Sequence, residues 1–151
     1  MRIDKDSYYL QIAHDAATRS TCLRRAYGAV IVNNGEIIAT GYNGAPRHRE
    51  NCCDRGVCER ERLGVAHGER YELCRSVHAE ANAIISASRR DMLGGTLYLS
   101  GIDVPSGEPL SAPAPCDMCK RLIINAGISQ IITRTDGEIK IIPIEEFIRE
   151  G

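Results

Sequence analysis

Residues 77–85 read Val-His-Ala-Glu-Ala-Asn-Ala-Ile-Ile, and residues 115–120 read Pro-Cys-Asp-Met-Cys-Lys. Three side chains here are typical zinc ligands: His78, Cys116 and Cys119. Three protein ligands leave the fourth tetrahedral position open for water, which is the arrangement of a catalytic zinc site. Glu80 follows the histidine by two residues, so it stands beside the metal, where a carboxylate can accept a proton from water. We therefore predict a catalytic zinc with Glu80 as its proton shuttle.

The two motifs are informative because they occur together. A lone Cys-x-x-Cys pair also occurs in redox sites and structural zinc knuckles, and a lone His-Ala-Glu is more often a helix cap or a core feature. The combination His-x-Glu and Pro-Cys-x-x-Cys is typical of zinc-dependent nucleobase deaminases. Helix formers in residues 79–88 and 116–126 place both motifs at predicted helix N-termini. The positive end of a helix dipole lowers a thiol pKa and favours the thiolate that zinc binds.

Length and charge restrict the class of protein. The 151 residues fit one domain, and 19 basic residues balance 20 acidic ones. Without a long basic run, a small substrate is a better expectation than a polynucleotide or a membrane. The polar N-terminus leads into no long apolar segment, so we expect a cytoplasmic protein without a signal peptide or membrane span. The seven cysteines then indicate metal binding or reduced thiols rather than disulfides.

The hydrophobic pattern predicts an α/β fold. Apolar residues at helical spacing predict a first helix that is capped at its N-terminus by Asp6 or Ser7. Strands at 28–32 and 36–41 flank the turn Asn33-Asn34-Gly35, which is typical of a hairpin. Further strands are expected at 96–100, 128–133 and 139–142, and a closing helix at 144–149. Alternating strands and helices predict a mixed sheet covered by helices on both faces.

From Tyr9 to about Thr133 the chain resembles the deoxycytidylate (dCMP) deaminases of the cytidine deaminase superfamily. The resemblance rests on these motifs, in order: Arg19-Ser-Thr-Cys22, Gly28-Ala-Val-Ile-Val32, Gly41-Tyr-Asn-Gly-Ala-Pro46, Leu63-Gly64, Gly68-Glu-Arg70, Glu72-Leu-Cys74, His78-Ala-Glu80 and Pro115-Cys-Asp-Met-Cys119. It implies a three-layer α/β/α fold with a central five-stranded sheet, and hydrolytic deamination of dCMP to dUMP. It also implies a homo-oligomer, commonly a hexamer, and in several members regulation by dCTP and dTTP.

The same resemblance implies roles around the substrate. Asn43 would hold the deoxyribose hydroxyl, and the backbone near Ala79 would help to seat the pyrimidine. Arg24 and Arg25 would face the 5′-phosphate, since guanidinium groups suit phosphate oxygens, and which of the two does so is open. The residues alone leave other interpretations, because Asn43 also fits a turn and the arginines also fit a solvated pair at a helix end.

Two departures from the resemblance affect the substrate. After the fourth strand, Arg134-Thr-Asp-Gly-Glu138 replaces the tyrosine-bearing segment that relatives often have near the nucleotide. Relatives run almost directly from the third strand into Pro-Cys, whereas residues 101–114 intervene here and change a loop next to the expected site. Deaminases of a free purine, a modified nucleotide or a tRNA adenosine are therefore alternatives, although the balanced charge disfavours RNA. A non-catalytic, zinc-stabilised regulatory module is a further alternative. Glu80 argues against it, because a structural zinc site has no use for that carboxylate.

The polar segment 47–75 is too long to lie idle in a compact domain. We predict that a second, structural zinc orders it, with four thiol ligands: Cys22 (expected at the end of the first helix), Cys53, Cys58 and Cys74. Alternative ligands, in decreasing order of weight, are Cys52 and His67, and then His48. The competing interpretation is a set of free cysteines that behave as small core residues.

Overall fold

The computed structural model describes residues 1–66 and 68–151 and is built around one five-stranded sheet, with the strand order β2-β1-β3-β4-β5. The strands are β1 (Arg25–Asn33), β2 (Glu36–Tyr42), β3 (Thr96–Asp103), β4 (Gln130–Thr135) and β5 (Glu138–Pro143). Only β3 and β4 pair in parallel, and the other neighbours are antiparallel. The sheet is therefore mixed, as predicted.

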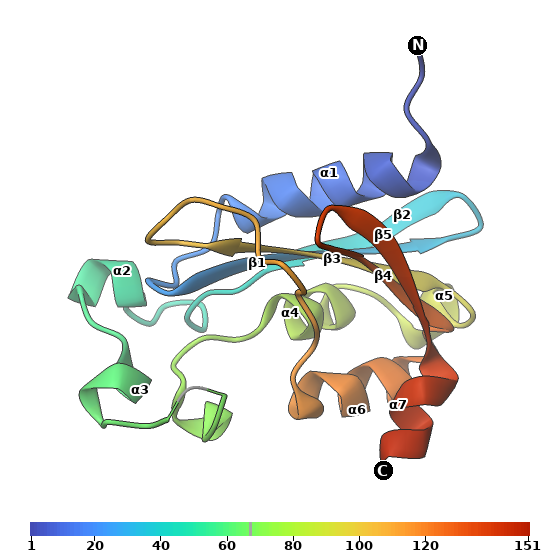
Figure 1. The fold of residues 1–151 in the computed structure, drawn as a ribbon. Helices are drawn as coiled ribbons and strands as arrows, with labels where there is room; N and C mark the ends of the chain where they lie inside the picture. Colours follow the sequence, from blue (N-terminus) through green and yellow to red (C-terminus); the bar gives the residue numbers. More distant parts are fainter. Residues whose placement is uncertain (67) are drawn as a thin grey trace.

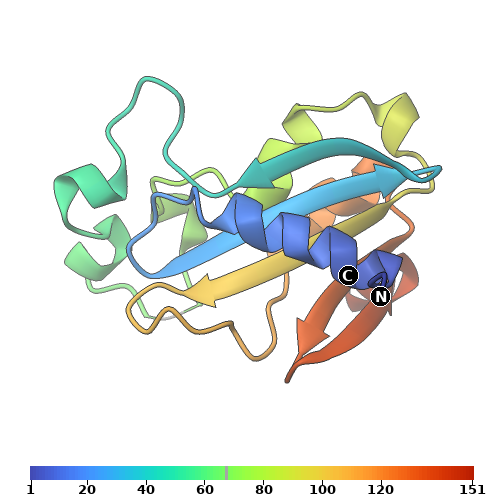
Figure 2. The same cartoon turned by 90° about the horizontal axis from the view of Figure 1, so that it is seen from above.

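Helices cover both faces of this sheet (Figure 1). Helix α1 (Lys5–Ala17) lies on one face, and α4 (Ala79–Ile85), α6 (Asp117–Ala126) and α7 (Ile144–Glu150) lie on the other. The shorter elements are α2 (Cys52–Arg55), α3 (Glu59–Arg62), the 3₁₀ turn η1 (Tyr71–Leu73) and α5 (Arg89–Met92). Figures 1 and 2 show α2 and α3 together beyond the end of the sheet at which β1 begins. The predicted three-layer α/β/α fold is confirmed.

Alternation along the strands fills two apolar layers. Ile31 packs with Leu97 and Ile123 in the layer shared with α4 and α6. Its neighbour Val30 points to the opposite face and packs with Tyr98 in the layer under α1. Successive side chains of a strand point to opposite faces, so each inner strand contributes to both layers.

Two glycines let helices approach the sheet closely. A Cβ atom on Gly41 in β2 would overlap the carbonyl oxygen of Ala79 and lie 2.6 Å from the amide nitrogen of Ala83, both in α4. A Cβ atom on Gly28 in β1 would overlap the carbonyl oxygen of Ala13 in α1. Only glycine fits at these two contacts, which set the depth of α1 and α4 against the sheet.

The predicted start and end of the first helix are wrong. The Asp4 side chain caps α1 by accepting a hydrogen bond from the Ser7 amide at 3.0 Å, so the helix begins before Asp6. The helix ends at Ala17, and the hydroxyl of Thr18 bonds to the carbonyl of Asp15. Such local bonds compete with helical ones. Cys22 therefore lies in the connection to β1 and not at a helix end.

Residues 101–114 extend the sheet before they approach the site. Strand β3 continues to Asp103, whose carboxylate accepts bonds from the amide and hydroxyl of Ser106, and the chain turns back. Ile102 then pairs with Pro109 in an isolated bridge. The insertion is thus an ordered hairpin-like turn.

In the part of the chain that the structure describes, no helix has the length and apolar character needed to cross a bilayer.

Candidate zinc-dependent active site

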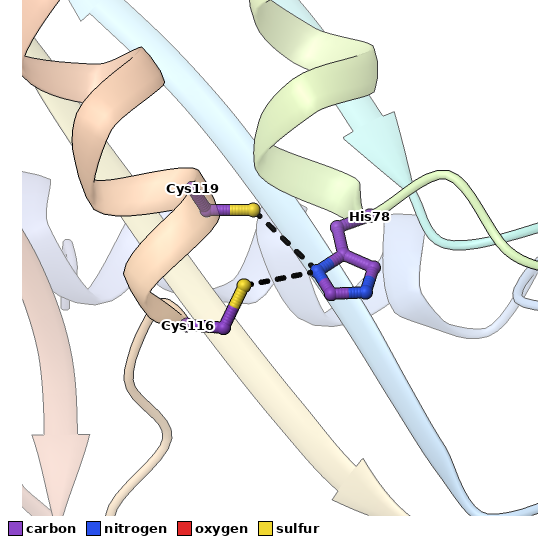
Figure 3. A group of neighbouring side chains, drawn as sticks. All are labelled: His78, Cys116 and Cys119. Atoms are coloured by element: carbon purple, nitrogen blue, oxygen red, sulfur yellow. Dashed lines mark hydrogen bonds between the residues drawn. The ribbon is translucent and has the colours of Figure 1, made fainter. Parts of the chain in front are cut away.

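The three predicted zinc ligands lie together. His78 immediately precedes α4, Cys116 immediately precedes α6, and Cys119 lies in the first turn of α6. The sulfurs of Cys116 and Cys119 are 3.4 Å and 3.5 Å from Nδ1 of His78 (Figure 3). Tetrahedral zinc with ordinary bond lengths places imidazole nitrogen and thiolate sulfur about 3.5 Å apart. The donor set and its spacing therefore fit one zinc ion.

Helix packing produces this convergence. Helices α4 and α6 lie side by side on the same face of the sheet. Both begin at the same end of the molecule, so their first turns face one another across the site. The two motifs are nearly 40 residues apart in sequence, and the shared helix layer brings their N-terminal ends together.

Hydrogen bonds among the three ligands, and one with Cys74, shift the pKa values of the ligands. A bond from Cys119, and next one from His78, lowers the pKa of Cys116 to about 4. Bonds to Cys116 and then Cys74 raise the pKa of His78 to about 10. The pKa of Cys119 is raised, first by its bond to Cys116 and then by burial. Because zinc binds thiolates and a neutral imidazole, its binding to these three side chains must release protons.

Glu80 is a buried carboxyl group beside the ligands. It lies in the first turn of α4, and 4% of its surface is exposed. Burial is the main reason why its pKa is raised above the ordinary value. A carboxyl group with a raised pKa can both take up and return a proton near neutral pH. The position and environment of Glu80 suit a proton shuttle.

The site opens into a cavity of about 590 Å³, within the range of small-molecule sites. His78, Glu80 and Cys116 line this cavity together with Arg24, Arg25 and Asn43. Ala79 is fully buried and does not line the cavity. Several lining residues were not assigned to the site from the sequence: Tyr27, Arg60, Arg70, Tyr71, Glu72 and Ser76. Most come from the segment after β2, which carries no periodic pattern.

Asn43 has a structural part in the cavity wall. Its Oδ1 accepts a hydrogen bond from the Tyr27 amide at 2.8 Å, and its Nδ2 donates to the Arg25 carbonyl at 2.9 Å. These bonds fasten the end of β2 to the start of β1. An amide side chain retains a further lone pair and a further N–H, so this role leaves capacity for a substrate hydroxyl.

The two predicted phosphate arginines lie at the start of β1 and not at a helix end. Arg24 forms an ion pair with Glu61 of α3, with 2.9 Å between Nε and Oε1. Arg25 is the first residue of β1 and forms a hydrogen bond with Tyr27. The helix-end interpretation of this pair is therefore wrong, because the helix ended earlier.

The cysteines of the polar segment are only partly arranged as predicted. Cys52 is buried, and its pKa is raised by burial and then by the nearby Cys22, Cys74 and Cys58. Cys53 is exposed. The buried member of the Cys52-Cys53 pair is thus the one grouped with the other thiols. Of the other candidate ligands, His48 is exposed, and His67 lies outside the described residues.

Those four thiols do not form a closed metal site in the structure. Among residues 1–66 and 68–151, only His78, Cys116 and Cys119 bring three ligand atoms within 4.8 Å of one another. All seven cysteines are free. The ligand set predicted for the catalytic zinc is therefore brought together in the structure, whereas the second predicted set is a loose cluster.

The sheet, with paired helix N-termini that carry His-x-Glu and Cys-x-x-Cys, is the architecture of the cytidine deaminase-like hydrolytic deaminases. The family model of the cytidine and deoxycytidylate deaminase zinc-binding region matches residues 3–135. The chain belongs to this family, which agrees with the resemblance and with the class of enzyme expected from the sequence.

Individual deoxycytidylate deaminases are similar to most of this chain. The deoxycytidylate deaminase of Saccharomyces cerevisiae is 40% identical over 134 residues, which cover 87% of this chain and 38% of the yeast protein. That of Mycobacterium phage D29 is 37% identical over 136 residues, covering 87% of this chain and 94% of the phage protein. The dCMP deaminase of cyanophage S-TIM5, solved in complex with dCMP and dUMP, is 26% identical. It superposes with a TM-score of 0.62 over 89% of this chain and 84% of its own.

Proposed function

We propose that this protein catalyses the hydrolytic deamination of a pyrimidine nucleotide, dCMP to dUMP, with release of ammonia. One observation carries the proposal: a zinc-type ligand triangle lies beside a buried glutamate, and two of its members, His78 and Cys116, line the same cavity as Glu80. Relatives that are named deoxycytidylate deaminases support the choice of dCMP.

The mechanism follows from these residues. His78, Cys116 and Cys119 would hold zinc, which when bound supplies a Lewis acid that lowers the pKa of water. Glu80 accepts a proton as water adds to C4 of the pyrimidine, and it delivers a proton to N3. The proton of the new C4 hydroxyl then passes to the amino group, which leaves as ammonia, so cytosine and water become uracil and ammonia. The cavity walls hold the base in line with Glu80 and replace a chance encounter by a positioned one.

The substrate is tested by comparing rates of ammonia release from dCMP, deoxycytidine, dCTP and guanine. We expect dCMP to react fastest. A preference for guanine would instead support the alternative of a deaminase for another base. Absence of release from every substrate, in protein that contains zinc, would support the non-catalytic module.

Arg24 and Arg25 are proposed to bind the 5′-phosphate, because both line the cavity and guanidinium groups pair well with phosphate. Replacement of each by alanine should raise KM for dCMP by about 10-fold or more and change KM for deoxycytidine little, since a charge-assisted hydrogen bond is worth about 1.5–3 kcal/mol. Arg62→Ala is the matched control, because Arg62 is exposed and pairs with Glu59 in its own helix. Equal turnover of deoxycytidine and dCMP by the unmodified protein would contradict phosphate recognition.

We further propose a second, structural zinc, now with Cys52 in place of Cys53. Burial of Cys52 and its closeness to Cys22, Cys58 and Cys74 support this ligand set. Elemental analysis of the reduced protein should find about two zinc ions per chain, one for each site. Cys52→Ser should lower that to about one, and Cys53→Ser, its exposed neighbour, should leave it unchanged. About one zinc in the unmodified protein, unaltered by Cys52→Ser, would contradict the second site.

A homo-oligomer is proposed as the working form. Apolar side chains on the outer helix layer support it, including Ile85 of α4, which is 75% exposed, and Leu122 of α6. Light scattering on the purified protein tests the assembly. Regulation by dCTP or dTTP is tested by adding each nucleotide to the dCMP assay, and unchanged rates would contradict it.

A further inference from the structure

Arg60 is a buried charge outside the zinc ligand set. It belongs to the short helix α3, and 6% of its surface is exposed. Its Nε and Nη2 donate hydrogen bonds to the carbonyl oxygen of Glu69 at 3.0 Å and 2.8 Å, and Nη2 also reaches the carbonyl of Ala66 at 3.3 Å. A guanidinium group is costly to bury unless such partners are present. Arg60 therefore ties α3 to the chain that leads into η1.

The same guanidinium group rests on an aromatic ring. Its central carbon lies 4.3 Å from the centre of the Tyr71 ring, a cation–π contact. The Tyr71 ring in turn lies 5.6 Å from the ring of His78, centre to centre, with the two planes at 88°. This edge-to-face geometry is a favoured arrangement of aromatic rings. A continuous stack thus runs from Arg60 through Tyr71 to the zinc-type histidine.

We propose that Arg60 and Tyr71 are positioning residues that hold the His78 ring with Nδ1 facing Cys116 and Cys119. This inference rests on the proposed function, because it concerns the same zinc. A ligating imidazole needs a partner outside the ligand set to fix the orientation of its ring. Here the hydrogen bond with Cys74 is one such partner of His78. The edge-to-face contact with Tyr71 is a second that limits rotation of the imidazole, and Arg60 packs on the same Tyr71 ring.

The chemistry of Arg60 is specific to arginine. Its planar fork reaches two carbonyl groups while its flat face covers the Tyr71 ring, and lysine can do neither in the same way. Arg62 lies two residues further along the same helix, is exposed, and pairs with Glu59. It offers a matched arginine that does not belong to the stack.

The experiment measures zinc affinity at the catalytic site of the full-length protein by competition with a chromophoric chelator. In this titration, the loss of zinc from the catalytic site is the step that is absent in Cys116→Ser. We expect Tyr71→Leu and Arg60→Ala to bind this zinc roughly 10-fold more weakly, the order seen when outer partners of metal ligands are removed. Tyr71→Phe, which keeps the ring, and Arg62→Ala should bind zinc as the unmodified protein does.

Three results would overturn the proposal. Wild-type zinc affinity in Tyr71→Leu would show that the ring does not orient His78. Equal weakening in Tyr71→Phe or in Arg62→Ala would show that the stack is not the cause. A fall in the thermal midpoint of the zinc-free protein that accounts for the whole loss of affinity would make the role purely structural. If Arg60→Ala does not fold, Tyr71→Leu decides alone. If the unmodified protein binds no zinc through Cys116, the proposed function fails instead.

Discussion

Glu80 combines two properties that oppose each other. A carboxylate prefers water, yet this one is 4% exposed, and its burial raises its pKa. Few apolar cores tolerate such a group without a strong partner. The cost of burial is consistent with a group retained for proton transfer beside the zinc-type ligands.

Glu80→Gln tests this residue. The amide keeps the size of the side chain but cannot accept and return a proton, so turnover of dCMP should fall by about 10²- to 10⁴-fold. Zinc content should be unchanged, since Glu80 is not among the three grouped ligands. Steady-state rates and elemental analysis of the same preparation make the measurement. Near-wild-type turnover would show that another group moves the proton.

At the level of elements, the contact of α4 with the sheet places the first half of the site. The backbone of α4 approaches β2 so closely that Gly41 has no room for a side chain. His78 and Glu80 stand at the start of this helix, so any lift of α4 from the sheet would move them relative to Cys116 and Cys119. Gly28 has the same relation to α1, on the face without the site.

Gly41→Ala and Gly28→Ala form a matched pair. Each adds one methyl group against helix backbone, and overpacking of this kind costs about 1–3 kcal/mol of unfolding free energy. Both variants should lose comparable stability in urea denaturation. Only Gly41→Ala should also weaken zinc binding and turnover, because α4 carries residues of the site and α1 does not. Equal effects of the two variants on zinc affinity would contradict this division between the faces.

At the scale of the whole molecule, tyrosine side chains connect α1 to the sheet in the apolar layer opposite the site. The Tyr98 hydroxyl on β3 donates a 2.6 Å hydrogen bond to Asp6 of α1, and its ring packs against Tyr9. Burial, and then the bond to Asp6, raises the pKa of Tyr98 well above its ordinary value. The folded protein therefore holds this proton more tightly than the unfolded chain does.

This linkage sets the response of stability to alkaline pH. A raised folded-state pKa contributes fully below the unfolded value of 10.0, and the contribution is lost as pH rises through the folded value. Tyr98→Phe should therefore lose about 1.5–3 kcal/mol at pH 8, the value of a hydrogen bond to a charged group. The difference in unfolding free energy between Tyr98→Phe and the unmodified protein should shrink above about pH 10. Urea denaturation of both proteins at about pH 8 and above about pH 10 measures this difference. The same difference at both pH values would contradict the linkage.

Local spacing in the sequence was sufficient to predict much of the fold and of the candidate site. The alternation of strands and helices predicted the three-layer sheet, because periods of 2.0 and 3.6 residues report which faces are buried. His-x-Glu and Cys-x-x-Cys predicted the ligands that meet in the structure, because each motif sits at a helix start and needs only one contact between helices. The helix boundary at Ala17 was missed, since hydroxyl groups that bond locally end a helix without a glycine or proline signal.

The sequence by itself determined the family, the fold class and the residue types of the zinc-type site. Only the tertiary structure decided which of the adjacent Cys52 and Cys53 is buried, and that Arg60 packs on Tyr71, whose ring meets that of His78 edge to face. The physical reason is that the segment after β2 has no repeating apolar face. Its side chains are oriented by contacts with distant elements, so nothing in their order along the chain tells which of them point inward.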